Sequence, residues 1–382
     1  MAREHGGSLS YWNMREFYAG SEPIQTSEYC LYTDSHVIGE WSSPSSPHKF
    51  INLIPFRHEA GRIQEAVTLR ITWVVDGKRK FPQSTDNTSY HGGWATDELA
   101  ALASLRLGIR LKAGGETRIF GSYSSDPLGT PISSGKGKPE IFIRGNRLIL
   151  PSVFQQSNLK SLDAIDSLRT VSERQFIALV RAARQFQNAI WIAESEPELA
   201  WLIFVSAIET AACEWASSLP ERTSAVDTLR HVKSEFSRQL LESGGEKAVE
   251  IVAHQFADTL QATKKFLDFC IEFMPEPPED RPAAHVQIPW DRKGIKKILN
   301  KIYNFSSCAL HAGVPFPSPL CKPPELVERS EGSGYAEVGT GALAVHAHGA
   351  SWTAADLPIS INTFCVLVKG ILNKWWDTII AA

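Results

Sequence analysis

The stretch Ser172-Glu-Arg-Gln-Phe-Ile-Ala-Leu-Val-Arg-Ala-Ala-Arg-Gln-Phe-Gln-Asn-Ala-Ile190 marks the point where strand patterns give way to helix patterns. Ser172 and Gln175 have the spacing of a capping box, in which each side chain accepts a backbone N–H at the start of a helix. Apolar residues then recur three and four positions apart, as on one face of a helix. The stretch therefore predicts an amphipathic helix that opens a helical region.

The rest of the C-terminal part continues this pattern. A second start signal at 195–198 includes a proline, which the first turn of a helix tolerates. Gly244 and Gly245 should end one helix, and a cluster of prolines after Phe273 should end another. Residues 313–355 are rich in proline and glycine and predict a long irregular segment. Five further helices are expected, over about 195–215, 224–241, 246–273, 291–311 and 361–375.

Residues 1–155 show mainly strand patterns. The segment 69–75 is rich in β-branched and aromatic residues and ends at the turn dipeptide Asp76-Gly77. The segment 141–150 predicts a hairpin around Gly145-Asn146. One helix is expected over 96–108, with Gly114-Gly115 breaking the pattern that follows it. This region is therefore expected to be mixed, with strands predominating.

Together these patterns predict an α+β protein with a β-rich N-terminal domain over 1–155, which senses or positions something, and an all-α helical domain over 165–382. A length of 382 residues suits two domains. The chain shows no internal repeat.

Composition narrows the possible functions. The net charge is -3, so any attraction to nucleic acid must come from a local patch. The six cysteines form no CxxC pair, so no disulfide, metal site or other cofactor is expected. No apolar run of about 18 residues and no signal peptide is recognised, which predicts a cytoplasmic protein without membrane contact.

The segment Tyr303-Asn-Phe-Ser-Ser-Cys-Ala-Leu-His-Ala-Gly313 ends the helix expected over 291–311. Histidine titrates near pH 6.5, so His311 can donate or accept a proton at cellular pH. The same helix carries cations whose sign suits RNA. At a rise of 1.5 Å per residue, Lys297 lies about 21 Å from His311, so it would hold a neighbouring phosphate. The basic residues of this helix are Arg292, Lys293, Lys296, Lys297 and Lys301.

This segment and the helical layout resemble the HEPN superfamily, in particular abortive-infection and Apea-like HEPN proteins. The family motif is Tyr, two variable residues, Arg-Ser, three variable residues and His. Segments 104–115 and 126–131 also look like the N-terminal region of proteins that carry such a domain. The resemblance implies a homodimer that cleaves RNA without metal in antiviral defence, with His311 as general acid or base and Tyr303 starting the motif.

The chain departs from the family motif at Ser306, which stands where the arginine belongs. Losing a preorganised donor to developing negative charge costs about 100 to 1000-fold in rate. Ser307 and Asn304 would orient the ribose or phosphate, and Glu209 is a possible orienter of His311. Two hypotheses follow: an RNA-cleaving effector, or a noncatalytic module that binds RNA, a phage component or a partner protein.

Simpler interpretations stay open for each feature. His311 can instead interact with the carbonyls at its helix end, the lysines can form a solvated face, and Glu209 can be a surface carboxylate. His346 and His348 are interpreted as loop residues, and the pair 375–376 of tryptophans as core and interface packing. No phosphate-binding glycine loop and no Ser-His-Asp pattern is present.

Overall fold

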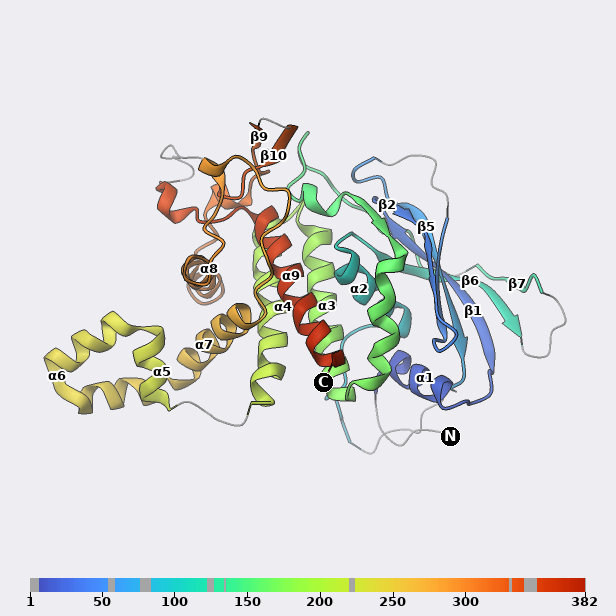
Figure 1. Cartoon of the computed structure of the whole chain (residues 1–382), viewed down its shortest axis with the longest axis horizontal. Helices are drawn as coiled ribbons and strands as arrows, with labels where there is room; N and C mark the ends of the chain where they lie inside the picture. The colour runs from blue at the N-terminus through green and yellow to red at the C-terminus, as the bar shows by residue number, and fades with distance from the viewer. Residues whose placement is uncertain are drawn as a thin grey trace.

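The computed structural model describes residues 7–53, 59–75, 84–121, 127–133, 135–219, 224–329, 332–339 and 349–381. It has an antiparallel sheet in the N-terminal part followed by many helices, so the predicted α+β class is confirmed. Figure 1 shows the sheet at one side of the molecule, a layer of helices in the middle and a helical arm at the other side.

The sheet is antiparallel and has the strand order β3-β4-β5-β1-β6-β7. The strand expected at 69–75 is part of β5, while the turn expected at Asp76-Gly77 lies outside the described residues. The strands are β1 (Gln25–Thr33), β3 (Glu40–Ser42), β4 (His48–Asn52), β5 (Gln64–Trp73), β6 (Lys112–Gly121) and β7 (Thr130–Pro131). A separate parallel pair joins β2 (His36–Ile38) to β8 (Gln156–Asn158).

Two predictions for the N-terminal part are wrong, namely the hairpin at 141–150 and the break at Gly114-Gly115. The segment 141–150 forms no strand, because the backbone N–H groups of Ile149 and Leu150 donate to the buried carboxylate of Glu194 instead of to a strand partner. Gly114 and Gly115 break no element but lie inside β6. A Cβ at Gly114 would meet the side chains of Cys30 and Tyr32, so the glycine permits close packing in the sheet.

Helices α1 (Leu9–Tyr18) and α2 (Ala95–Leu107) belong to the N-terminal part. The expected helix over 96–108 is confirmed as α2, whose leucines at 99, 102 and 105 are all buried. It ends at Gly108, which has a φ of 72°, a conformation that glycine adopts without strain.

Helices α3 (Glu173–Ile192) and α4 (Pro197–Ser217) form the centre of the molecule. The predicted capping box is present, because Gln175 N donates to Ser172 Oγ and Ser172 N donates to Gln175 Oε1. A second capping box does not form, since the N-cap of α4 is Glu196 and its side chain makes no capping bond.

The helix expected over 361–375 is confirmed as α9 (Ile361–Ala381), which packs on α3 and α4. The rings of Trp201 and Phe364 stack with centroids 4.7 Å apart across this contact.

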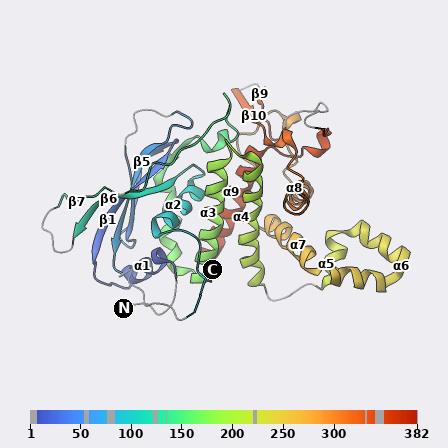
Figure 2. The same ribbon diagram turned by 180° about the vertical axis from the view of Figure 1, so that it is seen from behind.

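Three helices replace the two that were expected over 224–273. They are α5 (Ala225–Val232), α6 (Ser234–Gln255) and α7 (Ala257–Glu272). The backbone breaks at Lys233 and Phe256, and Gly245, with a φ of 68°, kinks α6. Figures 1 and 2 show α5 and α6 projecting from the body as an arm, which has a small core of its own.

Helix α8 (Arg292–Ala312) matches the prediction at both ends. The Asp291 carboxylate accepts hydrogen bonds from Lys293 N and Gly294 N, and Gly313 ends the helix with a φ of 65°. The following irregular segment contains the hairpin of β9 (Leu326–Arg329) and β10 (Gly332–Tyr335). His346 and His348 lie outside the described residues.

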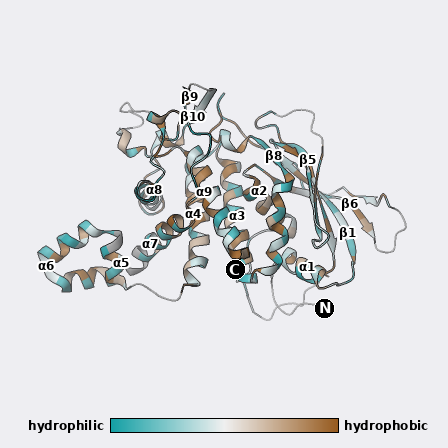
Figure 3. Cartoon of the chain, viewed as in Figure 1, coloured by the Kyte–Doolittle hydropathy of each residue, from teal (hydrophilic) through white to brown (hydrophobic). Residues whose placement is uncertain are grey.

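One continuous core joins the N-terminal and C-terminal parts. Its buried residues come from the sheet and from helices α2, α3, α4, α7, α8 and α9. The fully buried Arg110 guanidinium pairs with Asp34 and Glu194, which lie on either side of the expected domain boundary. In Figure 3 apolar residues are concentrated in the central helices. The two parts are therefore packed together, and the boundary near 155–165 stays a prediction.

Two stretches, Pro197–Ser217 and Ala354–Ala381, are long and apolar enough to cross a membrane by length and composition alone. The expectation that no apolar stretch reaches this length does not hold for them. In the structure 44% and 67% of their apolar windows are buried inside the protein, so the second window is mostly buried, as in a core helix.

Candidate nucleic-acid interface

The two ends of α8 have different surroundings. Near its N-terminus, Lys293, Lys296, Lys297 and Asn300 lie at positions i, i+3, i+4 and i+7, so they share one helical face. This face meets α7, whereas His311 at the other end of α8 is exposed.

A cavity of about 250 Å³ lies between α7 and α8, and we call it the lysine cavity. Four of its lining residues are lysines and one is an aspartate, so positive charge predominates. Lys264 Nζ pairs with Asp268 Oδ2 at 2.5 Å, which compensates one of these charges. The lining residues are Lys264, Leu267, Asp268, Lys293, Lys296, Lys297 and Asn300. A hollow of this charge attracts anions such as phosphate.

Asn300, which lines this cavity, carries a polar atom that the protein does not satisfy. Its Oδ1 is buried and has no hydrogen-bond partner among the described residues. Buried polar atoms in folded proteins are nearly always paired, so an unpaired acceptor beside a cavity indicates a partner from outside the chain.

His311 lines none of the cavities that we describe. His311 and Asn304 are exposed, and Ser307, which lies between them in the sequence, is half-buried. No hydrogen bond or ion pair to the His311 imidazole is found within the described part of the chain. Fourteen positions separate His311 from Lys297, which corresponds to about 21 Å along the helix axis. The histidine and the lysine cavity are therefore separate features of one subunit.

Ser306 is buried, with 4% of its surface exposed. Its hydroxyl donates to the carbonyl oxygen of Tyr303 at 2.8 Å, so it turns back onto its own helix. The position that carries arginine in the family motif consequently points into the protein, and Ser306 contributes no donor beside His311.

Glu209 is held by Tyr303 and not by His311. The Tyr303 hydroxyl donates to Glu209 Oε1 at 2.9 Å. Burial raises the pKa of both groups, while the hydrogen bond from Tyr303 lowers that of Glu209. This contact joins α4 to α8, and we find no contact between Glu209 and the imidazole among the described residues.

Two other predicted RNA contacts, Lys301 and Arg292, lie outside the lysine cavity. Lys301 Nζ pairs with Asp356 Oδ1 at 2.8 Å and donates to the carbonyl of Ala355, so it fastens the segment before α9. The hydrogen bond from Lys301 Nζ to the Asp356 carboxylate lowers the pKa of Asp356. Arg292 is exposed at the start of α8 and lines none of these cavities.

Sequence reasoning missed the contribution of α7. Lys264 and Lys265 are adjacent in a helix that was expected, but which neighbour they face depends on how α7 packs. The two adjacent positive charges were the available signal. Only the structure shows that Lys264 faces the lysines of α8.

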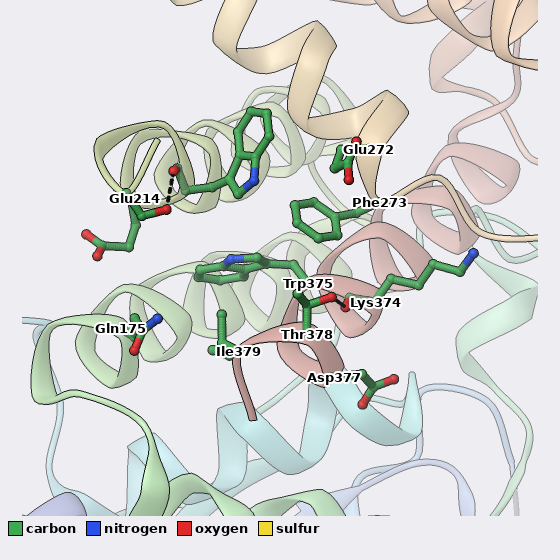
Figure 4. Close-up of a pocket in the computed structure, with 11 residues that line it drawn as sticks. Gln175, Glu214, Glu272, Phe273, Lys374, Trp375, Asp377, Thr378 and Ile379 are labelled. Carbon is green, nitrogen blue, oxygen red and sulfur yellow. Dashed lines mark hydrogen bonds between the residues drawn. The ribbon is translucent and has the colours of Figure 1, made fainter. Parts of the chain in front are cut away.

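The largest of the described cavities, about 440 Å³, lies between α4, α7 and α9. Figure 4 shows the aromatic side chains of Phe273 and Trp375 among those around it. Two of its carboxylates, Glu214 and Asp377, are already paired with Arg174 and Arg106. Trp375 and its neighbour in sequence are both buried, in agreement with the interpretation as core packing. This cavity carries no clear charge preference.

No group of three or more His, Cys, Asp or Glu side chains that could hold a metal is found in the parts of the chain that the structure describes. All six cysteines are free thiols.

Comparison of the chain with protein-family models, with curated proteins and with solved structures gives no match. The resemblance to HEPN proteins therefore stays a prediction, and the function has to be argued from the site.

Proposed function

We propose that the protein binds single-stranded RNA through the lysine cavity, as a HEPN-like module that does not depend on the family's arginine for its function. The observation that carries this proposal is the convergence of four lysines from α7 and α8 around one cavity. Contacts between lysines and phosphates supply most of the sequence-independent affinity for nucleic acid.

The unpaired Asn300 Oδ1 favours RNA over DNA. An acceptor among phosphate-binding lysines suits a hydroxyl donor, and the ribose 2'-hydroxyl is the donor that distinguishes RNA. The overall charge of -3 does not oppose this binding, because the positive charge is local and the Debye length is about 8 Å at physiological salt.

Two features argue against a strong nuclease. Ser306 is buried and bonded to its own helix, so no charged donor takes the place of the motif arginine. The lysines of α8 that line the cavity lie about 21 to 27 Å along the helix from His311, too far to stabilise a phosphate that the imidazole serves in the same subunit.

The decisive experiment measures fluorescence anisotropy of labelled single-stranded RNA at several salt concentrations. In the variant Lys293→Gln/Lys297→Gln we expect affinity to fall about tenfold and the slope of log K against log salt to decrease by about 1.4, since each phosphate contact to a single strand contributes about 0.7. The exposed Lys160 in the segment Leu159–Thr170 provides a control, and Lys160→Gln should bind as the wild type does. Equal affinity and slope in the double variant would overturn the proposal.

A second candidate function is metal-independent RNA cleavage, and one observation favours it. Asn304, Ser307 and His311 are spaced three and four residues apart, so they share one face at an accessible helix end. A partner subunit of the predicted homodimer would have to supply the missing cation. Incubating labelled single-stranded RNA and tRNA with a metal chelator and the wild type or His311→Ala tests this candidate. Cleavage that His311→Ala abolishes would establish it, and intact RNA in both samples would reject it.

A further inference from the structure

A second cavity adjoins the lysine cavity, on the other side of the Lys264–Asp268 ion pair. It is about 250 Å³ in volume and lies between the end of α4, helix α5 and helix α7. We call it the threonine cavity. Its lining residues are Cys213, Trp215, Ala216, Ser217, Leu219, Thr228, Gln261, Lys264, Lys265 and Asp268. Because Lys264 and Asp268 line both cavities, the two cavities are neighbours.

Thr228, which lines this cavity, carries an unsatisfied polar group. Its side chain is 1% exposed, and its Oγ1 has no hydrogen-bond partner among the described residues. Threonines within helices commonly donate to the carbonyl four residues earlier, as Thr210 does to Ser206 and Thr378 does to Lys374. Thr228 lacks this bond, so its buried hydroxyl is left for whatever occupies the cavity.

The walls of the threonine cavity combine apolar and polar groups. Trp215 and Leu219 supply apolar surface, while Gln261, Lys265 and Thr228 supply groups that form hydrogen bonds. The Trp215 ring is held from the protein side by edge-to-face contacts with Phe269 and Phe273, at 5.8 and 6.0 Å between centroids. A flat, heteroaromatic ligand with polar edges fits this combination, and an unstacked nucleobase is such a ligand.

We propose that the threonine cavity receives one unstacked base of an RNA strand whose phosphates lie in the lysine cavity. In this arrangement Thr228 Oγ1 forms a hydrogen bond with the edge of the base, and the ion pair of Lys264 and Asp268 lies where the strand passes between the two cavities. The inference rests on the proposed function, to which it adds recognition of a base.

Two ligands and two variants test it. The ligands are a short single-stranded RNA and an abasic ribose-phosphate strand of the same length, each measured by fluorescence anisotropy. We expect the wild type to bind the RNA more tightly than the abasic strand. Thr228→Val keeps the shape and removes the hydroxyl, so it should weaken RNA binding about fivefold and leave binding of the abasic strand unchanged. Thr228→Ser keeps the hydroxyl and should bind as the wild type does.

Thermal unfolding provides the structural control. Since Thr228→Val removes an unpaired buried hydroxyl, its melting temperature should equal or exceed that of the wild type. Equal binding of both strands by the wild type, or equal weakening of both by Thr228→Val, would overturn the base pocket. If the lysine variants still weaken binding in that case, RNA binding itself stands. Absence of binding to either strand would instead reject the proposed function.

Discussion

At the two ends of α8, the end with the clearer sequence motif is not the end with the more promising binding site. The C-terminal end carries the more recognisable motif, yet His311 lies on an exposed helix end without a charged partner among the described residues. The N-terminal half carries only a run of basic residues, yet these residues line an open cavity together with helix α7. A motif identifies residue types, whereas binding also requires neighbours that hold a ligand. The comparison therefore favours the lysine end as the binding site.

The largest expected effect comes from restoring the motif arginine. Ser306→Arg places a long cationic side chain at a buried position, so we expect the free energy of unfolding to fall by about 3 kcal/mol. Chemical denaturation measures this change. Asn304→Arg, at an exposed position of the same helix, is the matched control and should shift stability by less than about 0.5 kcal/mol. A Ser306→Arg protein as stable as the wild type would contradict the inference that this position points into the protein.

Charge reversal at the two ends measures their difference directly. Lys293→Glu/Lys297→Glu puts two negative charges beside the phosphates and should weaken RNA binding about 100-fold at low salt. His311→Glu makes a charge change of the same sign at the other end and should alter affinity less than about twofold, because exposed charges about 21 Å apart are screened from each other. Anisotropy titrations of both variants with one RNA provide the measurement. Comparable losses from both would show that the strand contacts the whole length of α8.

Local signals explain which parts of the fold the sequence predicts. The start of α3 and both ends of α8 follow from Ser172, Asp291 and Gly313, because capping is decided by a few neighbouring residues. The predicted hairpin at 141–150 failed because a carboxylate distant in sequence, Glu194, binds its backbone. Local patterns contain no information on such a competitor.

Only part of the candidate site could be predicted from the sequence. The lysines of α8 were identified from the sequence, but the cavity also needs α7, which starts only where the backbone breaks at Phe256. Phe256 carries no glycine or proline signal for that break. The burial of Ser306 was equally hidden, since a serine is compatible with either side of an amphipathic helix.

A smaller effect is expected at Asn300. This residue tests whether the lysine end of α8 also selects RNA over DNA, in addition to binding nucleic acid. Asn300→Ala removes the buried acceptor but none of the positive charges, so the preference for RNA over DNA of the same sequence should fall about fivefold. DNA affinity and the salt slope should hardly change, because they depend on the lysines. Parallel titrations with both nucleic acids give the ratio. A wild type that does not distinguish RNA from DNA would contradict the role of Asn300.

The smallest effect concerns Glu209, whose role differs between the two interpretations of the histidine end. Burial raises its pKa above the ordinary value of 4.5, so the folded protein holds this proton more tightly than the unfolded chain does. Stability should therefore decrease as pH rises from about 4.5 through the raised pKa and then become independent of this group. Glu209→Gln keeps an acceptor for Tyr303 and should remove this part of the pH dependence while changing stability at pH 7 by less than about 1 kcal/mol. Denaturation curves between pH 4 and 8 test this, and RNA binding should be unaffected. A loss of cleavage in Glu209→Gln with unchanged stability would instead assign the carboxylate to the histidine.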